Sequence, residues 1–177
     1  MTGSDDARLV GETLEGNLSA FERLVDRYQQ ALYNVAFRIT GDAADAEDIA
    51  QSAFLKAYEK LRSYDPKFKF FSWLYRIAVN EALNTQKKRR HHDALEESTL
   101  ADHATDEQVD RDGIIQRCLD RLTPDHRTVV ILRHFEDLSY EEIGETLGLP
   151  VKTVKSRLFS ARVKLRDLLI QQGLGQV

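Results

Sequence analysis

The sequence has few of the residues that cross-link or interrupt a fold. Among its 177 residues it has one cysteine, Cys118, and three prolines. A single thiol excludes an internal disulfide and fits a reducing compartment. The longest aliphatic run spans only residues 129–132, whereas a membrane helix needs about 20 apolar residues, so we expect no membrane insertion. Residues 1–6 are polar and acidic rather than signal-like, and we therefore expect a cytoplasmic protein.

Catalytic and metal-binding patterns are missing as well. The five histidines and Cys118 have no ligand spacing such as Cys-x-x-Cys or His-x-x-x-His. No glycine-rich phosphate loop and no nucleophile elbow is present. We therefore expect no metal, no cofactor and no enzymatic activity.

The charge is unevenly distributed along the chain. The formal net charge is −4, but it divides into −4 over 1–62, +5 over 63–92, −7 over 93–112, −3 over 113–149 and +5 over 150–177. Two basic segments separated by an acidic one indicate two surfaces that contact a polyanion. Charge alone leaves a solvated surface without a partner equally open.

Helical periodicity dominates the first half of the chain, and no strand-like alternation of useful length occurs. Apolar stripes with a 3.6-residue period predict helices over about 21–39 and 46–61, and a third from about 72 to 90. Gly41 is suited to end the first helix, and Asp42 to cap the second. The fold class we expect is all-α.

Residues 93–112 lack periodic apolar positions and are strongly acidic. They predict a flexible linker between a domain over 1–92 and a domain over 113–177. Two further apolar helical stripes, 114–122 and 129–135, follow the linker. The expected architecture is therefore two small helical domains joined by an acidic linker.

The strongest local pattern is a helix-turn-helix beginning at Leu138. Ser139 and Glu142 have the spacing of a capping box, Gly148 suits a left-handed C-terminal position, and Pro150 can start the next helix. The second helix has an apolar seam from Val154 to Leu165. Its basic, hydroxyl-bearing outer face would fit a DNA major groove, although helical hairpins of this kind also occur as plain packing units.

Aromatic residues alternate with lysines over residues 64–73, before the third helix. Aromatic faces stack on unpaired bases while lysines follow the phosphate backbone, so this composition suits single-stranded nucleic acid. The alternative is that Phe68, Phe70, Phe71 and Trp73 form core, and we expect this of at least two of them.

Three stretches resemble the bacterial extracytoplasmic-function (ECF) sigma factors, the compact branch of RNA polymerase specificity subunits. They are DAEDIAQSAF (45–54), WLYRIAVN (73–80), and LSYEEI (138–143) continued by 151–162. Together they follow the family's order and cover nearly the whole chain. The resemblance implies a non-enzymatic subunit whose first domain binds core polymerase and captures the minus-ten element as melted single strand. Its second domain would bind the minus-thirty-five element as duplex, and an anti-sigma factor would be a further partner.

The resemblance carries over to individual residues. Those implied to face core polymerase are Asp48, Gln51, Ser52 and Leu55. Those implied to surround an unstacked minus-ten base are Tyr64, Trp73, Arg76 and Asn80, and the lysines expected along the same strand are Lys67, Lys69, Lys87 and Lys88. Those implied to meet the major groove of the minus-thirty-five element and its phosphates are Lys152, Thr153, Lys155, Ser156, Arg157, Phe159 and Arg162.

One loop and one residue depart from the family pattern, and both affect which bases the protein would read. Many relatives have a small polar loop where this chain has Asp-Pro-Lys-Phe-Lys-Phe at 65–70, and Lys155 stands where arginine is frequent. A lysine replaces a bidentate contact with a single point contact. The alternative function is an operator-binding regulator whose amino-terminal half dimerises, and binding to core polymerase distinguishes the two.

Overall fold

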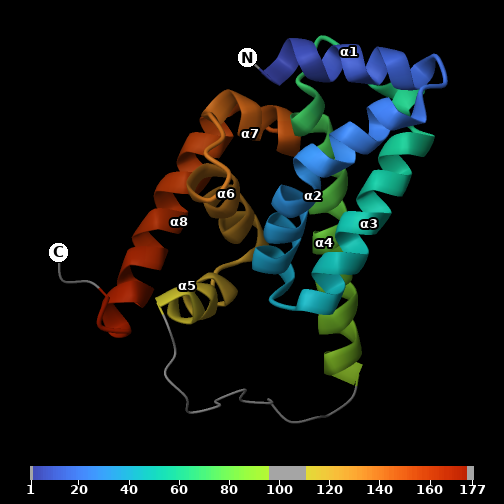
Figure 1. Ribbon diagram of the computed structural model, residues 1–177. Helices are drawn as coiled ribbons and strands as arrows, with labels where there is room; N and C mark the ends of the chain where they lie inside the picture. The colour runs from blue at the N-terminus through green and yellow to red at the C-terminus, as the bar shows by residue number, and fades with distance from the viewer. Residues whose placement is uncertain (1, 96–110, 175–177) are drawn as a thin grey trace.

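The computed structural model describes residues 2–95 and 111–174, and every regular element within them is helical (Figure 1). The first region contains α1 (Thr2–Leu14), α2 (Leu18–Thr40), α3 (Ala43–Glu59), the 3-10 turn η1 (Leu61–Ser63) and α4 (Phe70–Leu95). The second contains α5 (Arg111–Asp120), α6 (Pro124–His134), α7 (Tyr140–Leu147) and α8 (Val151–Gln171). The prediction of an all-α protein with two helical regions is confirmed. None of the described helices is long and apolar enough to cross a membrane.

Most of the predicted linker, residues 96–110, lies outside the described residues. The helices on either side extend into its ends, since α4 runs to Leu95 and α5 begins at Arg111. At its other end α4 begins at Phe70, two residues earlier than predicted, because the Trp73 amide already donates to the Lys69 carbonyl (3.3 Å).

Local capping sets the boundary between α2 and α3 as predicted. Gly41 adopts a left-handed conformation with φ 75°, and its amide donates to the Phe37 carbonyl. Asp42 accepts the Asp45 amide at 2.9 Å and so caps α3. Both features satisfy backbone groups that a helix end leaves without partners.

Helix α1 was not predicted, and it lies across one end of the first region (Figure 1). Asp6 is fully buried there, where it pairs with Arg27 and accepts the Tyr28 hydroxyl at 2.6 Å. Leu9 and Val10 are buried beside it. The pattern escaped recognition because a paired acidic residue occupies a core position that an apolar residue normally fills.

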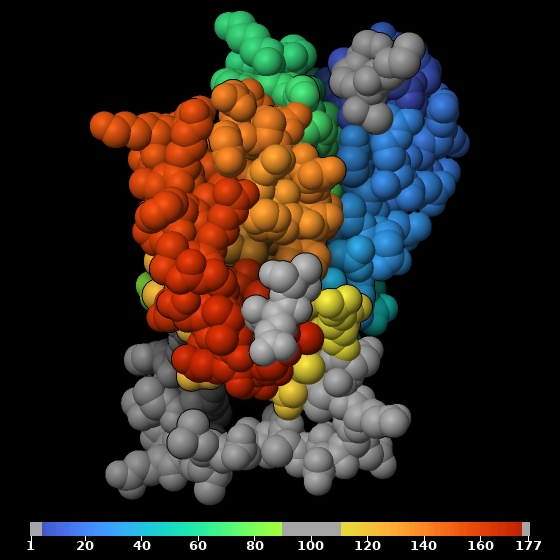
Figure 2. All heavy atoms as spheres, turned by 90° about the vertical axis from the view of Figure 1, so that its left-hand side faces the viewer, coloured from blue at the N-terminus to red at the C-terminus, as the bar shows by residue number. Residues whose placement is uncertain are grey.

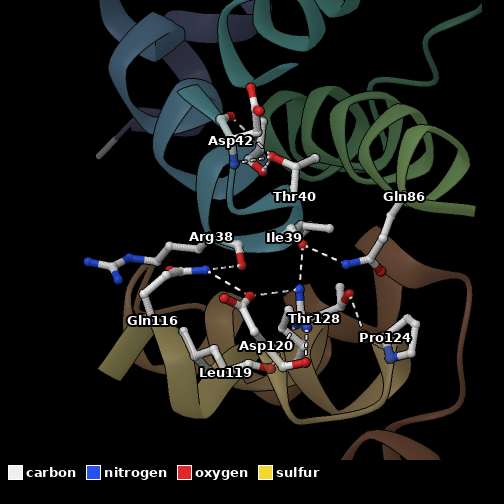
Figure 3. Close-up of polar contacts among 12 residues, drawn as sticks. Arg38, Ile39, Thr40, Asp42, Gln86, Gln116, Leu119, Asp120, Pro124 and Thr128 are labelled. Carbon is white, nitrogen blue, oxygen red and sulfur yellow. Dashed lines mark hydrogen bonds and ion pairs between the residues drawn. The ribbon is translucent and has the colours of Figure 1, made fainter. Parts of the chain in front are cut away.

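The two regions lie side by side, with α2 against α6 and α4 against α7 (Figure 1). Their buried side chains form one connected core. At the end of α2 the Ile39 carbonyl accepts from Gln86 (2.9 Å) and Arg127 (2.7 Å), and the Arg38 carbonyl accepts from Gln116 (3.2 Å; Figure 3). Side chains of the second region thus satisfy carbonyls that α2 itself leaves unpaired.

Candidate nucleic-acid and polymerase interfaces

The turn between α7 and α8 is tightly specified. Ser139 accepts the Glu142 amide (3.1 Å) and its own amide donates to the Glu142 carboxylate (2.8 Å), so the predicted capping box is present. Gly148 is left-handed, with φ 65°. A Cβ on Gly144 would lie 2.8 Å from the Leu149 carbonyl oxygen, closer than real Cβ contacts allow. The two glycines therefore let α8 cross close to α7.

Helix α8 buries one side and exposes the other. Val154, Leu158 and Ala161 are buried, whereas Phe159 is 71% exposed. In Figure 2 the helix runs down the face turned toward the viewer. Among the predicted minus-thirty-five residues, those fully on the exposed side are Lys152, Lys155, Ser156, Phe159 and Arg162, while Thr153 and Arg157 are half-buried.

The two predicted arginines of α8 are anchored on α6. Arg157 forms an ion pair with Asp125 at 2.9 Å. Arg162 donates to the Nε2 of His134 at 3.1 Å, which requires that nitrogen to be unprotonated. Burial, and then the charges of Arg162 and Arg133, hold the pKa of His134 below its usual value. These contacts fix the direction of both guanidinium groups before any DNA is present.

The aromatic residues around the start of α4 form a cluster. The rings of Tyr64, Phe70 and Trp73 have centroids 5.6–5.8 Å apart. Phe70 is fully buried, and Phe71 and Trp73 are half-buried against the core. Of the four aromatic residues expected to supply at least two core side chains, Phe70 is core, and Phe71 and Trp73 pack against the core without being fully buried. Tyr64 and Trp73, both predicted to face the base, are brought together.

The loop before α4 is held by its own hydrogen bonds. The Tyr64 hydroxyl donates to the Phe68 carbonyl (2.6 Å), and the Lys67 amide donates to the Asp65 side chain (3.0 Å). Phe68 is 50% exposed as a result. Sequence reasoning gave Phe68 no place in the site, although its position in the aromatic–lysine alternation was the available signal. Lys67 is exposed, and Lys69 forms an ion pair with Glu142 of α7.

Arg76 and Asn80 turn away from the aromatic cluster toward the second region. Arg76 donates through Nε to the Thr146 carbonyl (3.2 Å) and through Nη2 to the Glu145 carbonyl. Asn80 and Arg157 line a pocket of about 340 Å³ between α4 and the helix-turn-helix. The predicted base-binding residues are therefore divided between two places. Lys87 and Lys88, further along α4, are exposed.

An apolar groove of about 860 Å³ lies between α2 and α3. Two predicted polymerase-facing residues, Gln51 and Leu55, line it, and Leu55 is 67% exposed. Asp48 is exposed and Ser52 half-buried on the same helix. Sequence reasoning did not assign the further apolar residues of this groove to polymerase; they include Leu18, Phe21, Val25, Tyr33 and Tyr58. An exposed apolar patch of this kind marks an interaction surface.

Metal-binding side chains and a reactive cysteine are the other features considered in the described part of the chain. No group of three His, Cys, Asp or Glu side chains there is placed to hold a metal ion. Cys118 is buried, and burial raises the pKa of its thiol, which disfavours the reactive thiolate.

Comparisons with known proteins match both regions. The family described as Sigma-70 region 2 matches residues 24–92, and Sigma-70, region 4 matches residues 112–165. The ECF RNA polymerase sigma factor SigW of Bacillus subtilis is 34% identical, covering 90% of this chain and 94% of that protein. The RNA polymerase sigma-H factor of Pseudomonas aeruginosa is 37% identical, covering 92% of each.

Solved structures resemble the chain across both regions. CnrH in complex with the cytosolic domain of CnrY has a TM-score of 0.75 at 28% identity, covering 94% of this chain and 98% of that one. The sigma factor RpoE of Bartonella quintana, in complex with the anti-sigma factor NepR, has a TM-score of 0.70 at 27% identity, covering 84% and 96%. The chain therefore belongs to the ECF sigma factors of the sigma-70 family, the subunits with which RNA polymerase recognises promoters.

Proposed function

We propose that this chain binds core RNA polymerase in the cytoplasm and directs initiation by reading two promoter elements in different forms. Helix α8 reads the minus-thirty-five element as duplex, and the start of α4 with its preceding loop reads the minus-ten element as melted single strand. One observation carries this division: the exposed face of α8 is basic, whereas the other surface combines lysines with an aromatic cluster. The chain itself performs no catalytic step.

Duplex reading rests on the chemistry of the α8 face. Lys155 can donate to guanine O6 or N7 as a point contact, and Phe159 can lie against a thymine methyl group. Lys152 and Arg162 are exposed near them and can contact phosphates, which positions the helix without carrying sequence information.

Single-strand reading rests on stacking and on one amide. Unstacking a base costs a few kcal/mol, which aromatic side chains and hydrogen bonds to the base edge offset. Phe68 and Trp73 offer ring surfaces, and Asn80 offers an amide for the base edge.

The α2–α3 groove, together with Asp48 and Ser52, is the surface that we assign to binding core polymerase. Such a groove suits an amphipathic helix that lays apolar anchors into it. Gln51 and Leu55 at its edge are free of helix packing. Large exposed apolar side chains at the centre of an interface commonly carry most of the binding energy.

We further propose an anti-sigma protein as partner, since the sigma factor RpoE of Bartonella quintana is seen in complex with the anti-sigma factor NepR. The alternative of an operator-binding homodimer has no support from the comparisons, because both halves match sigma regions.

The division between duplex and single strand is tested with matched pairs on α8 and α4. Fluorescence anisotropy of the complex with core polymerase is measured on a minus-thirty-five duplex and a minus-ten single strand. Lys155→Ala should cost about 1–3 kcal/mol on the duplex and nothing on the single strand. Asn80→Ala should show the reverse pattern, because amide readout needs an unpaired base. The controls Lys164→Ala and Asn84→Ala change exposed residues of the same types on the same helices.

Asn80→Ala is a cleaner test than Trp73→Ala, because removing a half-buried ring also costs stability. Thermal unfolding of each variant separates folding from binding. If Asn80→Ala weakened both DNA forms alike, or neither, the proposed division between the two surfaces would be wrong.

The polymerase surface is tested with Gln51→Ala combined with Leu55→Ala. Both side chains are exposed or groove-lining, so helix content and duplex binding should remain while affinity for core polymerase falls. Leu14→Ala is the control, since Leu14 is also exposed (41%) but lies outside the groove. If the parent and the double variant bound core polymerase with equal affinity in a pull-down titration, the groove would not be the polymerase-binding surface.

A further inference from the structure

Tyr140, the first residue of α7, has a positively charged side chain from each of two neighbouring helices over its ring. The Arg133 guanidinium of α6 and the Lys155 ammonium of α8 each lie 5.5 Å from the ring centroid. An aromatic ring attracts a cation held within about 6 Å of its centroid, because its face carries partial negative charge. Tyr140 is therefore placed to restrain a side chain of the helix assigned to duplex DNA.

The tyrosine ring is held more firmly than the lysine over it. Tyr140 is half-buried against the core and directly follows Ser139, whose capping box fixes the start of α7. Arg133 also donates to the Leu138 carbonyl at 2.8 Å, so its guanidinium is anchored by a second contact. Lys155 is exposed, and among the described residues no hydrogen bond or ion pair holds its ammonium. The ring of Tyr140 is thus the contact on which the direction of Lys155 depends.

A restraint of this kind matters more for a lysine than for an arginine. The lysine ammonium is a compact charge on a flexible stem, whereas the planar arginine fork is already organised for a base edge. In the major groove an unrestrained ammonium can reach guanine O6 and N7 and the nearby phosphates alike. Contacts with phosphates add affinity but carry no sequence information, so a lysine spread over both kinds of acceptor discriminates poorly.

We propose that Tyr140 is the positioning residue that gives Lys155 its base specificity. The ring limits the directions of the lysine stem, so that the ammonium meets the edge of one base pair instead of spreading over neighbouring acceptors. Tyr140 acts through Lys155 and needs no contact of its own with DNA. The inference rests on the proposed function for Lys155 as a duplex-reading residue, and adds to it the residue that directs this reading.

The test uses the complex with core polymerase and a set of minus-thirty-five duplexes in which each base pair is replaced in turn. Competition anisotropy gives the discrimination at each base pair, which is the ratio of affinities for the parent and the replaced duplex. Lys155→Ala first identifies the base pair that this lysine reads, because the ratio falls there. Tyr140→Leu removes the ring but keeps an apolar side chain. It should lower the ratio at that same base pair about two- to fivefold, as expected for an exposed cation–π contact, and leave the other ratios unchanged.

Three controls separate positioning from a general effect on the turn. Tyr140→Phe keeps the ring and should discriminate like the parent, and in a Lys155→Ala background Tyr140→Leu should lower the ratio no further. Lys152 is a second exposed lysine of α8, one turn earlier, and no ring among the described residues lies over it. Lys152→Ala should weaken all duplexes uniformly, and Tyr140→Leu should leave that effect unchanged. Thermal unfolding of each variant ensures that folded proteins are compared.

Three results would overturn the proposal. One is a Tyr140→Leu variant that discriminates like the parent at the base pair read by Lys155. Another is a loss of discrimination spread evenly over all base pairs, which would mean that the tyrosine only supports the turn. The third is a Tyr140→Phe variant as impaired as Tyr140→Leu, since the ring would then not be the feature that acts. If Lys155→Ala changed no ratio at all, the duplex-reading assignment of Lys155 in the proposed function would itself be refuted.

Discussion

Phe68 and Phe70 lie two positions apart in the chain but in opposite environments, 50% and 1% exposed. Phe68→Ala should therefore change the free energy of unfolding by less than about 0.5 kcal/mol. It should weaken binding of a minus-ten single strand by about 1–3 kcal/mol, because an exposed ring beside an aromatic cluster is a stacking surface. Urea unfolding and anisotropy on the single strand, in the complex with core polymerase, measure the two effects.

Phe70→Ala is the contrasting variant and should lose about 3–5 kcal/mol of stability through the cavity it leaves. A Phe68→Ala variant that binds the single strand as tightly as the parent would exclude the ring from the site.

At the scale of the element, Gly144 of the helix-turn-helix has no room for a side chain. Its missing Cβ would meet the Leu149 carbonyl at 2.8 Å, and that atom is backbone, so the turn has to shift. Gly144→Ala should cost about 1–3 kcal/mol of stability and weaken duplex binding. Gly11→Ala is the control, because a Cβ at Gly11 in α1 would meet nothing within 4 Å. If denaturant unfolding showed the same stability for Gly144→Ala and Gly11→Ala, the close contact at Gly144 would not be a constraint on the turn.

Asp42 makes the start of α3 sensitive to pH. Its pKa lies below the usual range because it accepts the Asp45 amide and, second, because Arg89 donates to it. A lowered pKa means that the folded chain favours the charged carboxylate. This stabilisation is therefore fully present above the usual pKa of about 3.9 and is lost as the pH falls from there through the lowered pKa of the folded chain. Asp42→Asn keeps a capping acceptor but does not titrate.

Between pH values of about 5 and 3, the parent should therefore lose more stability than Asp42→Asn. Urea unfolding at a series of pH values measures the difference. Parallel stability curves for the two proteins would show that the carboxylate charge of Asp42 contributes nothing.

Most helix ends were predictable because their signals are local. Gly41, Asp42 and the Ser139–Glu142 pair act on backbone groups within four residues, so sequence spacing alone reveals them. Helix α1 was not predictable in this way, since burial of Asp6 depends on Arg27 and Tyr28 in the next helix. Its role in the core appears only when the two helices are packed.

The candidate site residues also fall into two groups, those set by local sequence and those set by contacts between helices. The exposure of Lys155 and Phe159 follows from helical projection against a local seam. The direction of Arg76 does not, because the carbonyls it contacts are 69 and 70 residues away in the chain. The hydrogen bonds that orient Arg76 in the free chain thus depend on how the two regions pack together.

At the scale of the whole molecule, Arg127 is the central polar side chain of the joint between regions. It is 2% exposed and donates to the carbonyls of Leu119, Asp120 and Ile39. Arg127→Lys should cost about 1–3 kcal/mol, since a lysine cannot span three carbonyls and leaves a buried acceptor unpaired. The exposed Arg121→Lys should be neutral by comparison. Urea unfolding measures the free energy of unfolding of both variants. Equal values would mean that the three hydrogen bonds of the Arg127 guanidinium do not contribute to stability.

The carbonyl of Ile39 has a second donor, Gln86, from its own region, and Arg127 has two carbonyls in its own region. When the regions part, neither the Ile39 carbonyl nor the Arg127 side chain is therefore left without a hydrogen-bonding partner. The Arg38 carbonyl, by contrast, would lose the Gln116 amide that donates to it from the second region. A sigma subunit built this way keeps the Ile39 carbonyl at the end of α2 and the buried guanidinium of Arg127 hydrogen-bonded whether its two regions are together or apart.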